Sequence, residues 1–181
     1  MPYFIFIVNP AAGKGLHTES LCAKIHRYFS VRNMGFEIHL TTGPQDALQF
    51  VQSYPRQKEG AQICFVACGG GGTLHEVVNG AAKRSDCTVA VIPCGSGNDY
   101  VKNFGSADAF TDLERLVQGA PRPVDLLDCS GEYAVNLCNI GFDARVAHHM
   151  SKFKRIPFVS GPLAYTLSLL FCILGPISST M

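Results

Sequence analysis

The sequence lacks an excess of charge of either sign. Its 181 residues include 15 Lys and Arg against 14 Asp and Glu, which gives a formal net charge of +1. A chain with this balance has no global field that would attract nucleic acid or an anionic membrane. We therefore expect no nucleic-acid partner, and any anionic ligand has to be held by local geometry.

The sequence also lacks paired cysteine motifs and long apolar runs. None of its eight cysteines belongs to a C-x-x-C pair, so buried thiols in a reducing compartment are favoured over disulfides. The first ten residues, MPYFIFIVNP, have no cationic start and predict a buried strand instead of a signal peptide. The apolar stretch 163–174 is shorter than the roughly 20 residues of a bilayer span. Together these features predict a cytoplasmic protein.

Short apolar runs alternate with helical patterns along the first two thirds of the chain. Strands are predicted at 3–8, 35–40, 62–67 and 88–92, and helices at 18–32, 44–54, 73–84 and 108–118. Nearly continuous apolar runs are typical of parallel strands that are covered on both faces. The alternation predicts an α/β fold with a doubly wound, mainly parallel sheet joined by right-handed crossovers.

The pattern changes after Ala120. The runs VDLLDC and YAVNLCNI predict a strand pair with SGE (130–132) at its turn. Apolar residues at helical spacing over 163–174, including Leu163, Leu170 and Leu174, predict a helix that packs on another surface. We expect an α/β domain at 1–122 and the start of a β-rich second domain at 123–181.

Three glycine-containing loops follow predicted strands, namely NPAAGKG, CGGGGT and PCGSGND. In parallel sheets, ligands lie beyond the carboxyl ends of the strands, where such loops converge. Each glycine in a row costs about 0.5–1 kcal/mol relative to alanine, unless the backbone needs an unusual conformation or a close approach. The convergence therefore favours a phosphate-binding loop over a flexible turn.

Thr73 and Glu76 match the S/T-x-x-E pattern of a capping box, which predicts a helix that begins at Gly72 or Thr73. Its free N–H groups and positive dipole end would suit an anion. A capped helix without a ligand remains an alternative on this motif alone. The chain matches neither a Walker A loop nor a dinucleotide fingerprint, because GKGLHT lacks the Lys-Ser or Lys-Thr ending and position 18 is Thr18.

The loop PCGSGND adds polar chemistry. The Ser96 hydroxyl could hold a phosphate oxygen, and the Asp99 carboxylate suits Mg²⁺ bound through water. Asp125 follows in a later segment and could join the same network. These residue types are also common in turns and caps, so a structural role is the alternative.

In this order and spacing, NPAAGKG, GGGGTLHEVVNG, PCGSGND, VDLLD and NIGFDARV resemble the catalytic domain shared by diacylglycerol kinases, sphingosine kinases and bacterial lipid kinases. The resemblance covers nearly the whole chain and implies a Rossmann-like N-terminal domain. It also implies Mg²⁺-dependent transfer of the γ-phosphoryl group of ATP to a lipid hydroxyl, in lipid metabolism and phospholipid biosynthesis. Diacylglycerol or a sphingoid base would be the lipid substrate, with transient contact at a membrane surface.

The resemblance also implies the residues of the site. The nucleotide-binding residues would be Asn9, Pro10, Ala11, Ala12, Gly13, Thr41, Gly69, Gly70, Gly71, Gly72, Thr73, Leu74, His75 and Ser96. Asp99 and Asp125 would support the metal and water network. No catalytic residue is identified in this chain, since the general base of relatives is expected beyond Met181, in a larger second domain.

Two positions depart from the family pattern. Relatives read Gly-Gly-Asp-Gly-Thr followed by an apolar residue, Asn and Glu, whereas here Gly71 stands at the Asp position and His75 at the Asn position. Loss of a carboxylate that takes part in metal placement or proton transfer costs about 10²–10⁴ in rate, so we expect impaired catalysis. An end at Met181 would add to this impairment and leave the 163–174 helix as an association surface, for example in a homodimer.

Two other functions are compatible with the sequence. A non-catalytic nucleotide-binding or regulatory module would bind ATP without turnover and would bind a partner through its C-terminal helix. A NAD kinase-like enzyme would share the glycine loop and the fold type, although NPAAGKG and PCGSGND fit lipid kinases better.

Overall fold

The computed structural model describes residues 2–15, 18–56, 62–94, 98–153, 159 and 161–174. The chain divides into two compact units, residues 1–136 and residues 137–181. A boundary between functional domains after residue 122 stays a prediction.

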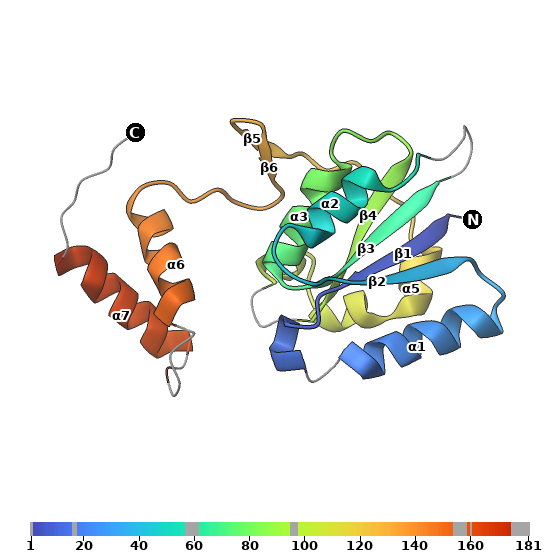
Figure 1. Cartoon of the computed structure of the whole chain (residues 1–181), viewed down its shortest axis with the longest axis horizontal. Helices are drawn as coiled ribbons and strands as arrows, with labels where there is room; N and C mark the ends of the chain where they lie inside the picture. The colour runs from blue at the N-terminus through green and yellow to red at the C-terminus, as the bar shows by residue number, and fades with distance from the viewer. Residues whose placement is uncertain are drawn as a thin grey trace. The chain divides into compact units, whose positions relative to one another are not determined.

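The first unit is built on a parallel sheet. Its strands are β1 (Tyr3–Val8), β2 (Phe36–Leu40), β3 (Ile63–Gly69) and β4 (Cys87–Pro93). They lie in the order β2-β1-β3-β4, and every neighbouring pair is parallel (Figure 1). The register places Phe4 opposite both Phe36 and Cys64. The parallel sheet predicted from the apolar runs is therefore confirmed.

Helices cover both faces of this sheet, as Figure 1 shows. One face carries α2 (Asp46–Ser53) and α3 (Gly71–Ala81), and the other carries α1 (Thr18–Val31) and α5 (Leu113–Gln118).

Alternate residues of each strand supply the two halves of the core. Ile5 and Phe65 pack with Val77 in the layer of α2 and α3, whereas Phe4 and Phe29 pack in the layer of α1 and α5. The rings of these two phenylalanines lie 5.3 Å apart, edge to face. Burial of one such side chain contributes about 1.5–3 kcal/mol, so the two core layers hold the strands in register.

The helix predicted over 108–118 is broken in two. A 3₁₀ turn, η2 (Ala107–Thr111), precedes α5, and Asp112 stands between them. The Asp112 carboxylate accepts hydrogen bonds from the backbone N–H groups of Glu114 and Arg115, at 2.9 and 3.4 Å. A side-chain cap of this kind starts a new helix, which is why the two segments do not merge.

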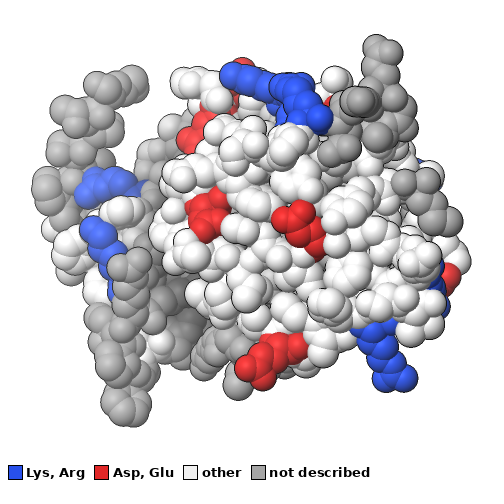
Figure 2. Space-filling model, turned by 45° about the vertical axis from the view of Figure 1, so that its right-hand side comes forward, with Lys and Arg blue, Asp and Glu red and all other residues white. Residues whose placement is uncertain are grey.

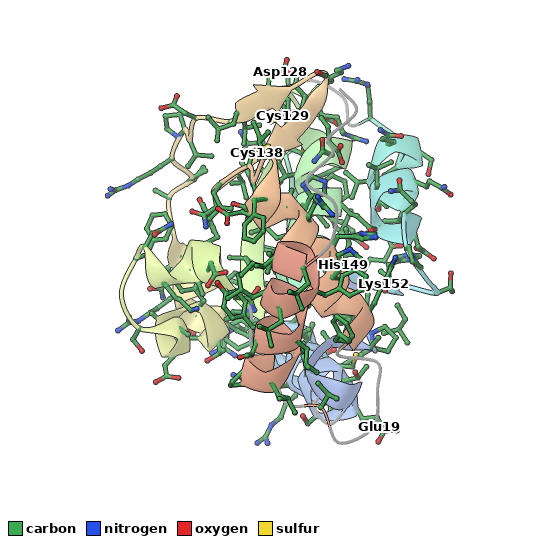
Figure 3. The ribbon with its side chains drawn as sticks, turned by 90° about the vertical axis from the view of Figure 1, so that its left-hand side faces the viewer. Glu19, Asp128, Cys129, Cys138, His149 and Lys152 are labelled. Carbon is green, nitrogen blue, oxygen red and sulfur yellow. The ribbon has the colours of Figure 1, made fainter. Side chains whose placement is uncertain are left out.

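A short hairpin ends the first unit. It consists of β5 (Leu127–Cys129) and β6 (Glu132–Ala134), which pair antiparallel as the sequence predicts. Ser130 and Gly131 form the turn with φ of 59° and 90°, the positive values of a type I′ turn. Asp128, labelled in Figure 3, accepts a hydrogen bond from the Gly131 N–H group at 2.7 Å. The second strand is shorter than the run YAVNLCNI, since no further strand pairs with it among the described residues.

The second unit contains two packed helices, α6 (Phe142–Phe153) and α7 (Gly161–Leu174). The helix predicted at 163–174 is confirmed, whereas α6 was not expected. The Phe171 ring of α7 lies 4.6 Å from the His149 ring of α6. Among the described residues, no helix is both long and apolar enough to cross a membrane.

Small side chains form the buried face of α7. Ala164, Ser168 and Cys172 recur at every fourth position and are buried. Of the leucines predicted to form the packed face, Leu163, Leu170 and Leu174 are exposed instead, and Leu167 is half-buried. Small side chains allow the axes of two helices to approach more closely than leucines do.

Arg84, just after α3, joins several segments of the first unit. Its guanidinium donates two hydrogen bonds to Asp86 (3.1 and 2.8 Å) and one each to the carbonyls of Val51 (3.0 Å), Tyr54 (2.6 Å) and Pro55 (3.4 Å). The Arg84 side chain is only 4% exposed. The guanidinium group therefore supplies hydrogen bonds to free carbonyls at the C-terminal end of α2 and to a carboxylate near the start of β4.

Replacement of Arg84 should strongly destabilise the first unit. We expect Arg84→Ala to lower the free energy of unfolding by about 3–5 kcal/mol, as is typical when one partner of a buried ion pair is removed. Arg32→Ala is the matched control, because Arg32 and Glu114 form an ion pair with side chains 44% and 48% exposed. It should cost about 1 kcal/mol or less. Urea denaturation followed by circular dichroism measures both, and equal losses would contradict the role of Arg84.

Candidate functional site

The strand order β2-β1-β3-β4 reverses direction between β1 and β3. In open α/β sheets, ligands bind in the crevice outside the carboxyl ends of the strands at such a switch point. The loop after β1 and the glycine row after β3 lie there. Two contacts join them: the Asn9 backbone N–H donates to the Cys68 carbonyl at 2.9 Å, and the Asn9 side-chain amide donates to Thr73 Oγ1 at 3.1 Å.

Helix α3 starts inside the glycine row. It begins at Gly71, and Gly70 is its N-cap without any side-chain cap. The predicted capping box is therefore wrong. The Thr73 hydroxyl accepts from Asn9, and the Glu76 carboxylate accepts from a backbone N–H of the loop after β2. Both side chains of the motif therefore form hydrogen bonds with other loops and do not cap their own helix.

Gly69 packs so closely against Thr73 that it leaves no room for a side chain. A Cβ atom at this position would lie 2.3 Å from Thr73 Oγ1 and 2.6 Å from Thr73 Cβ. The Gly69 carbonyl accepts hydrogen bonds from the Cys94 N–H at 2.9 Å and from the Asn98 side-chain amide at 3.0 Å. Three loops are thus joined around a residue that has no room for a side chain.

The first turn of α3 carries backbone N–H donors that are free to bind a ligand. Among the residues that the structure describes, none accepts a hydrogen bond from the N–H groups of Gly71, Gly72 or Thr73. This is expected in the first turn of a helix. A Cβ atom on Gly70 or Gly72 would meet nothing within 4 Å. Free N–H groups at the positive end of a helix dipole suit a phosphate, and the open space beside them leaves room for one.

The loop after β1 turns tightly around Asn9. Its side-chain oxygen accepts from the Ala11 N–H at 2.9 Å, and its carbonyl accepts from the Ala12 N–H at 3.1 Å. Gly13 has a φ of 60°, the left-handed region that favours glycine. Pro10 and Ala11 are exposed on this turn. Asn9 therefore shapes its own loop while it also contacts α3.

The loop after β2, which carries Thr41, is held by Asp46. The Asp46 carboxylate accepts hydrogen bonds from the Thr42 hydroxyl, from His39 Nε2 and from the Thr42 backbone N–H. These hydrogen bonds lower the pKa of Asp46 to about 2. Thr41 is buried, and its N–H donates to the Val8 carbonyl at 2.9 Å. The predicted site residue Thr41 is thus fixed at the carboxyl end of β1.

Asn79 of α3 binds the β5–β6 hairpin as a neighbouring strand would. Its side-chain amide donates to the Tyr133 carbonyl, and its side-chain oxygen accepts from the Tyr133 N–H, both at 2.8 Å. His75 Nε2 lies 2.8 Å from Glu132 Oε1 in the same interface. His75 therefore contacts the hairpin, and Leu74 is buried in the core. Neither Asn79 nor Glu132 is predicted from the sequence as a site residue, and only the polar residues in VVNG and SGE indicate them.

A polar groove lies beside this interface. Its volume is about 230 Å³, and Gln45, Glu76, Asn79, Lys83 and Glu132 contribute to its walls. Figure 2 shows one face of the molecule on which charged side chains are few and lie apart from one another.

The predicted metal network is spread over exposed positions. Asp99 begins the single-turn helix α4 (Asp99–Lys102) and its carboxylate lies 2.5 Å from the Lys102 ammonium group. Asp125 is exposed, and Ser96 lies outside the described residues. Within the described part of the chain, no group of three or more His, Cys, Asp and Glu side chains could hold a metal. The metal assignment stays a prediction.

Asp46 should make stability depend on pH in the acid range. Its pKa in the folded chain is about 2, below the ordinary value of 3.8, so folding favours the charged form. The resulting stabilisation is complete above about pH 4 and is lost as pH falls through about 2. We therefore expect the difference in unfolding free energy between wild type and Asp46→Asn to shrink as pH falls from 5 to 2. Urea denaturation across this range tests it, and a constant difference would contradict it.

Comparisons with known proteins identify a family for this chain. A family model for the diacylglycerol kinase catalytic domain matches residues 3–129. A diacylglycerol kinase of Bacillus subtilis (strain 168) is 31% identical over 170 residues, which cover 89% of this chain and 52% of that protein. A diacylglycerol kinase of Staphylococcus saprophyticus is 29% identical over 164 residues, covering 88% and 51%. The chain spans about half the length of the curated relatives it matches.

A solved structure shares the fold. The crystal structure of a diacylglycerol kinase from Bacillus anthracis str. Sterne aligns with a TM-score of 0.65 at 24% identity, over 84% of this chain and 53% of that one. The family model covers well over half of this chain and includes all four strands of the parallel sheet. The chain therefore belongs to the diacylglycerol kinase catalytic domain family.

Proposed function

We propose that this chain is the nucleotide-binding part of a lipid kinase, which transfers the γ-phosphoryl group of ATP to a lipid hydroxyl such as that of diacylglycerol. One observation carries the proposal. Among the described residues, the N–H groups in the first turn of α3 have no acceptor, and they lie at the switch point of the sheet in a chain of the diacylglycerol kinase family. Family membership supplies the reaction class, and the helix start supplies the binding site.

The N–H groups of Gly71, Gly72 and Thr73 would bind phosphate oxygens of ATP. Asn9 would keep the loop after β1 beside them through its hydrogen bond to Thr73. Phosphoryl transfer is catalysed mainly by positioning and by stabilisation of charge on the transferred group. A cradle of fixed backbone donors performs both tasks without any change in protonation.

Mg²⁺ is the metal that kinases of this kind use, and Asp99 and Asp125 are the carboxylates that would hold it through water. Their exposure fits a hard cation that keeps several of its own waters. The ion would neutralise charge on the phosphates when bound. The Asp99 side chain also contacts Lys102, so the metal would compete with that ammonium group.

Gly71 lowers the catalytic capacity that we propose. It is the first residue of α3, so a carboxylate in its place would stand among the phosphate-binding N–H groups. Glycine keeps the backbone donor and removes the side chain. A nucleotide-binding or regulatory module without turnover is therefore the second candidate function, and Gly71 is the observation that favours it.

The binding site can be tested by calorimetry with ATP and Mg²⁺. Wild type should bind ATP. Gly72→Ala should weaken binding about tenfold or more, because its methyl group would fill space beside the phosphate-binding N–H groups, and it should keep or raise stability, since alanine favours helix by about 1 kcal/mol. Gly69→Ala is the contrasting variant and should lose stability, because its Cβ overlaps Thr73. Unchanged ATP affinity in Gly72→Ala would contradict the site.

The catalytic arm of the same experiment uses ATP turnover with diacylglycerol in mixed micelles. Binding without turnover would support the regulatory module, and gain of turnover in Gly71→Asp would support an impaired kinase. NAD offered as the acceptor in parallel separates a NAD kinase-like enzyme from a lipid kinase. A chain that binds no ATP would overturn both nucleotide-dependent functions.

A further inference from the structure

Glu76 occupies an unexpected place in the candidate site. It lies on α3 and is half-buried, and its Oε1 accepts a hydrogen bond from the Gln45 backbone N–H at 3.0 Å. The carboxylate thus leaves its own helix and reaches the loop that leads from β2 into α2. Since α3 begins with the glycine row, this hydrogen bond links that row to a second loop of the site.

Gln45 has a strained backbone. Its φ of 70° and ψ of −6° are left-handed, a region that residues other than glycine rarely adopt. Such a conformation persists only where the surroundings hold it, and it is often found at binding sites. A charged acceptor on the Gln45 N–H is one contact that holds it. The loop therefore takes a shape that its own sequence does not favour.

The same loop is fixed at its other end. Asp46 accepts hydrogen bonds from the Thr42 N–H and hydroxyl and contacts His39 of β2. The Thr41 N–H is bonded to the end of β1. The segment Thr41–Gln45 is thus anchored to the sheet and to α2 at one end, and to α3 at the other.

Helices α2 and α3, which carry these anchors, pack closely against each other. Gly80 of α3 is buried, and a Cβ atom there would lie 2.7 Å from Val51 Cβ and 3.0 Å from the Leu48 carbonyl oxygen of α2. So close a contact leaves little freedom for sliding between α2 and α3. The Glu76 hydrogen bond can therefore transmit the position of α3 to the loop.

We propose that Glu76 is a positioning residue, which holds the Thr41–Gln45 loop in its binding conformation beside the glycine row. This inference rests on the proposed nucleotide site. Because the loop is ordered before the ligand arrives, binding avoids the loss of freedom that ordering would otherwise cost. Glu76 acts through the Gln45 backbone and does not have to touch the nucleotide.

The test compares Glu76→Ala with the conservative variant Glu76→Gln and with a matched control, Glu19→Ala. Glu19 lies exposed on α1, is labelled in Figure 3, and makes no hydrogen bond to any residue that the structure describes. Hydrogen exchange of the Gln45 and Thr42 N–H groups, followed by NMR without ligand, reports on the loop. Calorimetry with ATP and Mg²⁺ reports on binding.

In Glu76→Ala we expect both the exchange rate at Gln45 and the Kd for ATP to rise by about one to two orders of magnitude, as loss of one hydrogen bond to a charged group implies. Glu76→Gln keeps an acceptor oxygen and should recover much of both. The direction of the change in ATP affinity distinguishes a positioning role from a purely electrostatic one. Removal of a negative charge near a phosphate site would by itself tighten ATP binding, so weaker binding supports a positioning role.

Three outcomes would overturn the inference. Unchanged exchange at Gln45 in Glu76→Ala would mean that the hydrogen bond does not hold the loop. Faster exchange with unchanged or tighter ATP binding would mean that the loop is not part of the site, and the proposed function would survive. A wild-type chain that binds no ATP would overturn the proposed function and this inference with it.

Discussion

The absence of a side chain at Gly69 is the constraint on which the site depends. Thr73 occupies the space that a Cβ would need, and the Gly69 carbonyl bonds both Cys94 and Asn98. With Thr73 so placed, its hydroxyl can accept from Asn9, and the loops after β1, β3 and β4 converge. The free N–H groups of α3 follow in the next residues. The proposed phosphate-binding arrangement therefore depends on close backbone packing at Gly69. The three glycines that follow it have no side chains that would block a phosphate from the backbone N–H groups.

Helix α3 connects this cradle to the rest of the first unit. Successive residues contact different neighbours: Thr73 the loop after β1, Glu76 the loop after β2, Asn79 the hairpin and Gly80 helix α2. A displacement of the helix would move all four contacts together. For this reason we regard the strained loop before α2 and the hairpin after the sheet as outer supports of the proposed phosphate site, although neither contains a glycine-rich motif.

Sequence reasoning predicted the features that depend on local patterns. Continuous apolar runs predicted the four parallel strands, and the glycine loops after strands indicated the edge of the sheet where we propose the site. The predictions were wrong for side chains that can form a hydrogen bond either within their own helix or with a distant loop. Glu76 and Thr73 fit a capping box, yet both bind other loops. Asp112 breaks a helix that periodicity made continuous. Asn79 binds the backbone of a residue 54 positions away, and no local sequence pattern indicates such a contact.

The central claim is that backbone N–H groups at the start of α3 bind phosphate. Titration of the ¹⁵N-labelled chain with ATP and Mg²⁺, followed by two-dimensional NMR of the amides, tests it most directly. We expect the signals of Gly71, Gly72 and Thr73 to shift most, with smaller shifts in the loops joined to them. Signals of these three residues that stay in place while ATP binds elsewhere, or while it does not bind at all, would contradict the claim.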